Sequence, residues 1–145
     1  MSSKKTVFLK KYVDIYTEHL ADGVITPGDL VEITATGVKR HATADGVASP
    51  IFAREDFLQG KTISDNYAAL DRITVGHCVT GEVVQANLAN GEDVAKGDLL
   101  TSNGAGKLQK YDSSGEYVVA IANEAVDMSG SSGEDPAGTI SVTIF

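Results

Sequence analysis

The stretch VAKGDLLTSNGAGKLQKYDSSGEYVVAIANEA, residues 94–125, holds glycine turns between apolar runs, and the stretch ITPGDLVEITATGVKRHATADGVASPIFARED, residues 25–56, resembles it. Laid over each other without gaps, the two match 69 residues apart at Gly28/Gly97, Asp29/Asp98, Leu30/Leu99, Gly37/Gly106, Gly46/Gly115, Ala53/Ala122 and Glu55/Glu124. Glycine recurs where the backbone needs a positive φ or a tight reversal. We therefore expect the same succession of turns twice, with chance agreement in a chain of 15 glycines as the alternative.

Short runs divided by glycine follow along the rest of the chain. Most are rich in Val, Ile, Thr or Tyr, the residue types that favour strands. They lie at residues 30–34, 38–42, 47–54, 72–79, 82–88, 99–101, 107–111, 116–123 and 139–145. Turn signals at this spacing are typical of all-β proteins. The sequence therefore predicts a mainly β fold, a small β-barrel or β-sandwich of β-tulip type.

Two segments between these runs are predicted to be loops. Residues 55–71 link the two similar stretches, and we expect a short helix near residues 66–70. Residues 127–138 are rich in small polar and acidic side chains, so we expect them to be exposed and mobile.

The N-terminal segment fits two periodicities. Helical spacing joins Phe8, Tyr12, Ile15 and His19, whereas strand alternation joins Val7, Leu9, Val13 and Ile15. The β-branched and aromatic content, together with lysine pairs that discourage unwanted pairing, favours an extended arm or an edge strand over residues 1–20. We expect residues 21–145 to form one β-rich domain, in which 25–56 and 94–125 are related halves.

Composition argues against several classes of protein. The chain has 145 residues, of which 42% are hydrophobic and 22% charged, and no apolar run approaches the roughly 20 residues of a membrane span. A net charge of −8 opposes nucleic-acid binding, since the only lysine-rich segment is the N-terminal one. Because the N-terminus has no secretory signal pattern, we expect a soluble chain that stays where it is made, and the single Cys78 excludes an internal disulfide.

Motifs that suggest a cofactor do not meet its chemical requirements. The Gly-Lys of residues 103–109 lacks the earlier glycine and the following Ser or Thr of a phosphate-binding loop, because Thr101 and Leu108 occupy those positions. VAKGDLL, residues 94–100, resembles the turn of lipoyl and biotinyl carrier domains, but neither Met1 nor Met128 has a lysine beside it. The sequence predicts no cofactor, although a carrier or another β-barrel binding module stays open as an alternative.

Metal and catalytic sites are not expected either. His77 and Cys78 are the one adjacent pair of metal-binding residue types, but neighbouring strand residues point to opposite faces and a zinc site needs three or four ligands. One of the two should face the core and the other the solvent. The carboxylates lie mainly in turns, where Asp29 and Asp98 should accept backbone hydrogen bonds. The sequence therefore predicts that the protein is not an enzyme.

The C-terminal half resembles the head decoration (capsid cement) proteins of lambda-type tailed bacteriophages. The resemblance lies in LLTSNGAGKLQKYD (residues 99–112), VVAIANEAVD (residues 118–127) and AGTISVTIF (residues 137–145), which follow the family's order of strands. The chain departs from the family in having Tyr111 where the family tends to have tryptophan, and in its large N-terminal half.

This resemblance implies a structural protein of the virion, made in the bacterial host cytoplasm and docked on the capsid exterior. It implies the major capsid protein as partner and a homotrimer as the assembly. An arm that adds contacts but little core would touch the shell, and the candidate capsid-contact residues are Val7, Phe8, Leu9, Lys10, Lys11 and Tyr12. A carrier or binding module, a small hydrolase or isomerase, and other virion parts such as tail or fibre modules stay open as alternatives.

Overall fold

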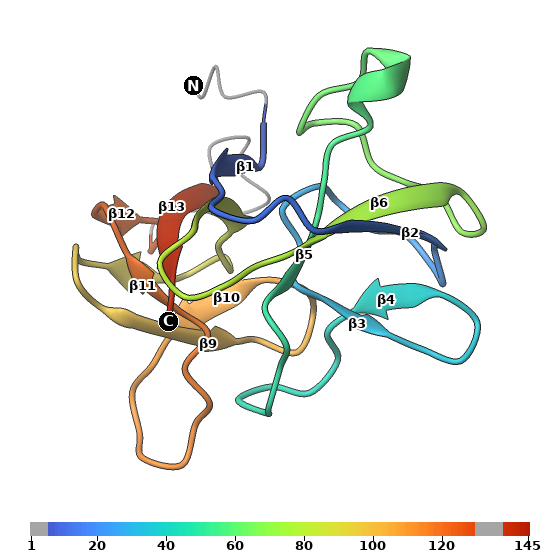
Figure 1. The fold of residues 1–145 in the computed structure, drawn as a ribbon. Coiled ribbons are helices and arrows are strands. Elements are labelled where there is room, and N and C mark those ends of the chain that lie inside the picture. Colours follow the sequence, from blue (N-terminus) through green and yellow to red (C-terminus); the bar gives the residue numbers. More distant parts are fainter. Residues whose placement is uncertain (1–5, 130–137) are drawn as a thin grey trace.

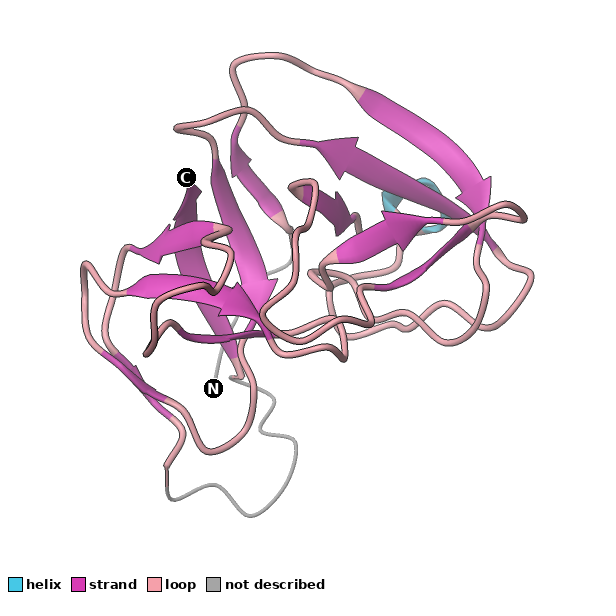
Figure 2. Ribbon diagram, turned by 90° about the horizontal axis from the view of Figure 1, so that it is seen from below, coloured by secondary structure: helices cyan, strands magenta, loops and turns pink. Residues whose placement is uncertain are grey.

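A computed structural model describes residues 6–129 and 138–145 of the chain, which form short strands and a single helical turn (Figure 2). The strands are β1 (Phe8–Lys10), β2 (Tyr16–Leu20), β3 (Val31–Ile33), β4 (Val38–Arg40), β5 (Ile51–Ala53), β6 (Arg72–His77), β7 (Val83–Asn87), β8 (Asp93–Val94), β9 (Leu99–Ser102), β10 (Leu108–Lys110), β11 (Ala120–Ala122), β12 (Val126–Asp127) and β13 (Thr139–Ile144). The helical turn is the 3₁₀ helix η1 (Phe57–Gln59). The predicted mainly β fold is confirmed.

The strands gather in two groups that lie side by side in Figure 1. One group is a six-stranded sheet of order β1-β7-β13-β11-β9-β10, with the small β12-β8 ribbon beside it. The other contains the three-stranded sheet β2-β6-β5 and the hairpin β3-β4. Neighbouring strands in these sheets are antiparallel, and the sheets of the described residues stay open, consistent with a β-sandwich-like fold and not with a closed barrel.

Each of the nine predicted runs contains one strand, but two short strands were not predicted. β8 and β12 have two residues each and pair with each other through Val94 and Val126. Strands this short leave no period in the sequence, because alternation needs at least four residues to be recognised.

The predicted helix near residues 66–70 is wrong. Tyr67 instead forms a bridge with Ile25, in which each backbone N–H donates to the other residue's carbonyl at 2.8 and 3.1 Å. Leu70 has a φ of 70°, which a helix cannot contain. A long-range pairing therefore overrides the local propensity of this segment. Of the predicted loop 127–138, residues 130–137 lie outside the described part of the chain.

The same order of pairing occurs twice along the chain. We call residues 16–77, which contain β2 to β6, the first half, and residues 83–144, which contain β7 to β13, the second half. The ladder β2-β6-β5 of the first half corresponds to β7-β13-β11 of the second, and the hairpin β3-β4 corresponds to β9-β10. A bridge joins Leu30 to Phe52 in the first half, and 69 residues later Leu99 pairs with Ile121. A hairpin is thus attached to the ladder in the same way in both halves.

The turn before each hairpin also recurs. Gly28 and Gly97 have φ values of 95° and 93°, which L-amino acids with a Cβ rarely adopt. The N–H of Gly28 donates to the carbonyl of Ala53 at 2.9 Å, and the N–H of Gly97 donates to the carbonyl of Ala122 at 2.8 Å. These matching bonds lie within the stretches 25–56 and 94–125 and join equivalent parts of them.

The two turn aspartates behave as predicted. The carboxylate of Asp29 accepts the N–H of Thr26 at 2.8 Å, and that of Asp98 accepts the N–H of Ala95 at 2.9 Å. The other glycine pairs do not match in conformation, because Gly106 and Gly115 have positive φ whereas Gly37 and Gly46 do not. The β9-β10 turn, residues 103–107, is one residue longer than the β3-β4 turn, residues 34–37, so the register of the repeat shifts there.

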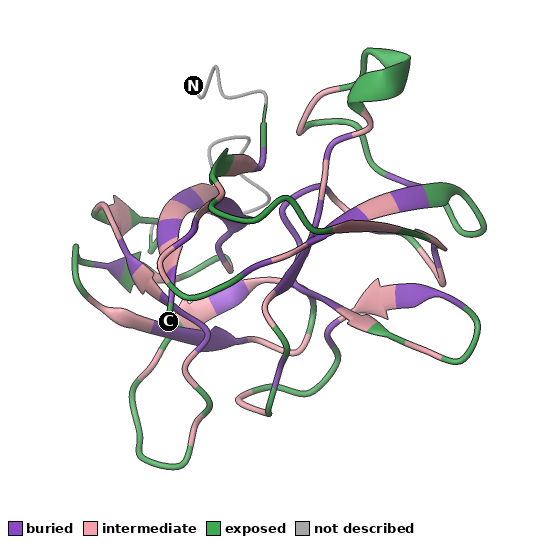
Figure 3. Ribbon diagram, in the orientation of Figure 1, coloured by how far each residue is buried: buried purple, intermediate pink, exposed green. Residues whose placement is uncertain are grey.

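Two clusters of buried apolar side chains stabilise the fold. Figure 3 colours the buried residues purple along the ribbon. The larger cluster lies mainly in the second half but also contains Leu30 and Phe52 from the first half, both fully buried. The smaller cluster belongs to the first half and includes Ile25, Ile73 and Val75. The two halves therefore share part of one core, which fixes the position of one against the other.

Candidate functional site

The N-terminal segment is bound along the second half of the molecule. β1 pairs with the outer edge of β7, where the N–H of Gln85 donates to the carbonyl of Val7 at 2.7 Å. The N–H of Val7 donates to the side chain of Glu55 at 3.2 Å. β1 is the end strand of the six-stranded sheet.

The segment contributes more to the core than predicted. Val7 is fully buried in the larger apolar cluster, and Phe8 packs against that cluster and over Gly76 of β6. The Phe8 ring also meets the ring of Tyr16 edge to face, with 5.5 Å between the ring centroids. The expectation of an arm that adds little core was wrong, because an apolar side chain on a paired edge strand is carried into the space between the two halves.

The six candidate contact residues divide between interior and surface. Val7 is buried, Phe8 is half-buried, and the side chain of Lys11 is only 4% exposed. The surface members are Leu9, Lys10 and Tyr12, with the Lys10 ammonium 5.3 Å from the centre of the Tyr12 ring. Only these three can present their side chains to a partner.

A buried carboxylate, Glu82, holds the end of this segment in place. It lies in the turn before β7 and accepts the ammonium of Lys11 at 2.9 Å. Three backbone N–H groups also donate to it, from Tyr12 at 2.7 Å, Val79 at 3.0 Å and Val13 at 3.1 Å. The carboxylate thus joins the N-terminal segment to the connection between the two halves.

The electrostatics of Glu82 follow from these contacts. Burial alone would raise the pKa of Glu82, but the Lys11 ammonium and the three backbone donors outweigh it and lower the pKa to about 2. The carboxylate is therefore charged at neutral pH and acts as a fixed acceptor. A carboxylate whose pKa lies so far below neutral pH is poorly suited to transfer protons.

Exposed apolar side chains surround this anchor. Tyr12, at 60% exposure, lies beside the turn, because a Cβ added to Gly81 would be 3.4 Å from the Tyr12 ring. The hydroxyl of Thr80 donates to the carbonyl of Phe145, which is itself 59% exposed. We use the name N-terminal patch for the exposed residues Tyr12, Val13, Ile15, Val79 and Phe145.

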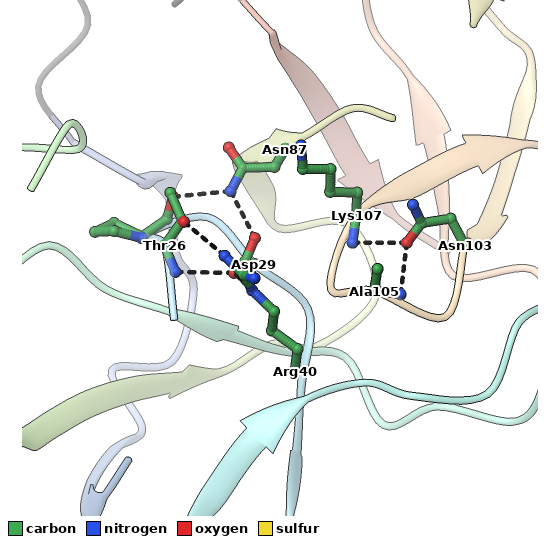
Figure 4. A network of polar contacts seen from close by, with 8 residues as sticks. Thr26, Asp29, Arg40, Asn87, Asn103, Ala105 and Lys107 are labelled. Carbon is green, nitrogen blue, oxygen red and sulfur yellow. Dashed lines mark hydrogen bonds and ion pairs between the residues drawn. The ribbon is translucent and has the colours of Figure 1, made fainter. Parts of the chain in front are cut away.

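A polar hollow of about 650 Å³ lies between the two halves, and Figure 4 shows its network. The fully buried Asp29 accepts Arg40 Nε at 2.7 Å and Asn87 Nδ2 at 2.8 Å. Asn87 also donates to the carbonyl of Pro27 at 3.1 Å. Burial raises the pKa of Asp29, and Arg40 opposes this rise. Since these bonds tie β7 to the turn before β3, their evident role is to join the halves.

The motifs considered for cofactors and metals have structural roles in the described residues. Asn103 Oδ1 accepts the N–H groups of Ala105 and Lys107, so the Gly-Lys segment is the predicted tight turn. His77 is partly exposed and its Nε2 lies 2.8 Å from the hydroxyl of Thr17, whereas Cys78 is buried in the core, as predicted. No group of three or more His, Cys, Asp or Glu side chains within 6–129 and 138–145 is placed to hold a metal ion.

Neither Glu82 nor the N-terminal patch was recognised from the sequence. The partners of Glu82 in the N-terminal segment are about 70 residues away, so no local pattern reports them. The one local signal is the bond from the N–H of Val79, three residues earlier, which resembles the Asp29 and Asp98 turns. In the described residues no helix is long and apolar enough to span a bilayer.

Comparison with known proteins identifies a shared fold. No protein-family model matches the chain, and no curated protein matches it. Among solved structures, the chain is similar to the crystal structure of the head fiber gp8.5 N base in bacteriophage phi29, with a TM-score of 0.61 and 15% sequence identity. The match covers 92% of this chain and 95% of that chain, so the likeness extends over both halves.

Proposed function

We propose that this chain is a structural protein of a phage head, which docks on the outer surface of the capsid. The observation that carries the proposal is the fold likeness to a phage head fiber base over 92% of the chain. The resemblance of residues 99–145 to decoration proteins of lambda-type phages points to the same class of protein by a separate route. In this role the protein belongs to the virion, its partner is the major capsid protein, and it has no catalytic task.

The surface supports adhesion. The N-terminal patch, together with Leu9, presents exposed apolar groups on the surface. Glu82 and Lys11 hold the backbone beneath the patch rigidly, so little conformational entropy is lost when it binds. We infer that this patch contacts the shell.

A docked protein of this kind would stabilise the head. It binds the assembled lattice and not free subunits, so binding shifts the equilibrium towards the closed shell by mass action. Several linked copies would multiply weak single contacts through avidity. The net charge of −8 keeps the protein soluble at high copy number and disfavours direct contact with the packaged nucleic acid.

The experiment is co-sedimentation of the purified chain with heads assembled from the major capsid protein of the same genome, followed by electron cryomicroscopy. We expect saturable binding and density at fixed positions outside the shell. Tyr12→Ser should weaken binding about tenfold or more, because it removes a large exposed aromatic contact. Tyr117→Ser is the matched control, since Tyr117 is 40% exposed and is not one of the patch residues. A chain that stays in the supernatant at every concentration contradicts the proposal, and equal binding by both variants contradicts the assigned surface.

A fibre base is a second form of the same role, favoured by the named part of the phi29 protein that the chain is similar to. A decoration protein occupies the shell in many copies and raises the temperature at which heads open. A fibre base carries a projecting fibre and need not change that temperature. Thermal release of packaged DNA, measured with and without the chain, separates the two forms.

A further inference from the structure

The two halves of the molecule differ at one strand edge. β2 of the first half corresponds to β7 of the second, because β2 pairs with β6 in the register in which β7 pairs with β13, 67 residues later. In this comparison Glu18 corresponds to Gln85 and Leu20 corresponds to Asn87. Equivalent strands in equivalent sheets should have equivalent needs for hydrogen-bond partners.

The outer edge of β7 is covered. The N–H of Gln85 donates to the carbonyl of Val7 in β1 at 2.7 Å, and the N–H of Asn87 donates to the carbonyl of Gly28 at 3.2 Å. β1 thereby adds one antiparallel strand to the sheet of the second half.

The outer edge of β2 is open within the described residues. The carbonyl of Ile15 accepts the N–H of His77, and the N–H of Ala21 donates to the carbonyl of Asp71, so odd-numbered positions of β2 point towards β6. The backbone groups of Tyr16 and Glu18 therefore point away from the sheet, and β2 is the last strand in its order. Leu20 is the last residue of β2, and Gly37 lies so close to its carbonyl oxygen that this group is covered.

This edge has little of the protection that proteins give to exposed strands. Proline, lysine and bulges usually block such edges, and β2 contains neither proline nor lysine and pairs in regular register over its five residues. The exposed charge on it is the carboxylate of Glu18, whose side chain is 53% exposed and lies 3.1 Å from Arg72. An added strand would gain backbone hydrogen bonds there and would meet a negative charge.

β1 of a second copy has a complementary charge on a less regular edge. Its pairing with β7 shifts register between Phe8 and Lys10, and this shift and the lysine are features that protect an edge, so an added strand there must offer the opposite charge. Its inner edge pairs with its own β7, and its outer edge has no strand beside it within the described residues. It carries the exposed Lys10, opposite in sign to Glu18. Pairing of β2 with β2 about a two-fold axis is disfavoured, because it would place Glu18 opposite its own copy.

We propose that the outer edge of β2 in one copy pairs with the outer edge of β1 in a second copy, with Lys10 of the second copy beside Glu18. The contact is head to tail, so it generates a ring where the rotation closes. It joins the β2-β6-β5 sheet of one copy to the six-stranded sheet of the next. β2 then has a strand on its outer edge, as β7 has β1 on its outer edge within one copy.

The test is the mass of the purified chain in solution, measured by sedimentation velocity and light scattering from micromolar to near-millimolar concentration. No capsid is present, so failure here is distinct from failure of capsid binding. We expect an oligomer, and we expect Glu18→Pro to weaken association about tenfold or more, because it removes an outward N–H and leaves the bonds to β6 intact. Glu18→Gln keeps that N–H and is the matched control.

A charge exchange tests the pairing independently of backbone changes. Lys10→Glu and Glu18→Lys should each weaken association, and the double variant should restore it. Circular dichroism and thermal melts check that each variant is folded. A chain that stays monomeric, an oligomer that Glu18→Pro leaves unchanged while folded, or two charge variants whose effects add without rescue would each overturn the proposal.

Discussion

Replacing the buried Glu82 by Gln is expected to destabilise the protein more than changing a surface carboxylate to an amide. The substitution keeps the size of the side chain and removes its charge. Lys11, 4% exposed, would then lack its counter-ion, and three backbone N–H groups would share one weaker acceptor oxygen. Removing one partner of a buried ion pair leaves an uncompensated charge and typically costs about 3–5 kcal/mol. Because water reaches this turn, we expect Glu82→Gln to lower the free energy of unfolding by about 2–4 kcal/mol at neutral pH.

The pH dependence follows from the pKa of Glu82, which is lowered from 4.5 to about 2. A lowered folded-state pKa contributes stability that is fully present above the unfolded value of 4.5 and is lost as the pH falls towards 2. The shift taken at full value corresponds to about 3 kcal/mol, and solvent screening reduces this to about 1–3 kcal/mol. The difference in the free energy of unfolding between wild type and Glu82→Gln should therefore become smaller below pH 4.5.

Urea denaturation followed by circular dichroism, at neutral pH and at pH 3, measures both effects. Glu18→Gln is the control, because its carboxylate pairs with Arg72 on the surface, where both side chains are more than half exposed. That change should cost less than about 1 kcal/mol. Equal losses for the two variants, or a Glu82→Gln difference that does not narrow in acid, would refute the assignment of Glu82 as an anchor.

Three further predictions concern stability and reactivity. Deletion of residues 2–11 should lower the free energy of unfolding by about 2 kcal/mol or more, because Val7 is fully buried and Lys11 is lost; an unchanged melting midpoint contradicts this. Gly97→Val should cost about 1–2 kcal/mol through backbone strain alone, because φ is 93° and an added Cβ meets no atom; an unchanged urea midpoint rejects the turn. Burial raises the pKa of the Cys78 thiol to about 12, so a thiol reagent near neutral pH should label it only on unfolding, and rapid labelling of the folded chain argues against a buried thiol.

Much of the fold could be predicted because its signals are local. The glycine before each hairpin has a positive φ, and the matched positions of Gly28 and Gly97 in the sequence indicate this need. The aspartate that follows each glycine accepts a backbone N–H three residues earlier, which is also a local bond. β-branched runs between such turns could only form short strands. Gly37 and Gly106 matched in sequence but not in conformation, since the longer second turn shifts the register.

The features that tertiary structure decided depend on residues far apart in the chain. Glu82 became an anchor because folding brings Lys11 and Tyr12 to it from about 70 residues away. Val7 was expected to contact the capsid from an extended arm or edge strand, and it is buried because β1 adds to β7, a pairing that no local pattern encodes. The sequence by itself thus determined the strands, the turns and the absence of a recognisable catalytic motif, since these follow from the conformations of neighbouring residues. Contacts between the two halves decide which strand edges are covered and which charges are buried. These contacts form only when the chain folds, so no local pattern in the sequence reports them.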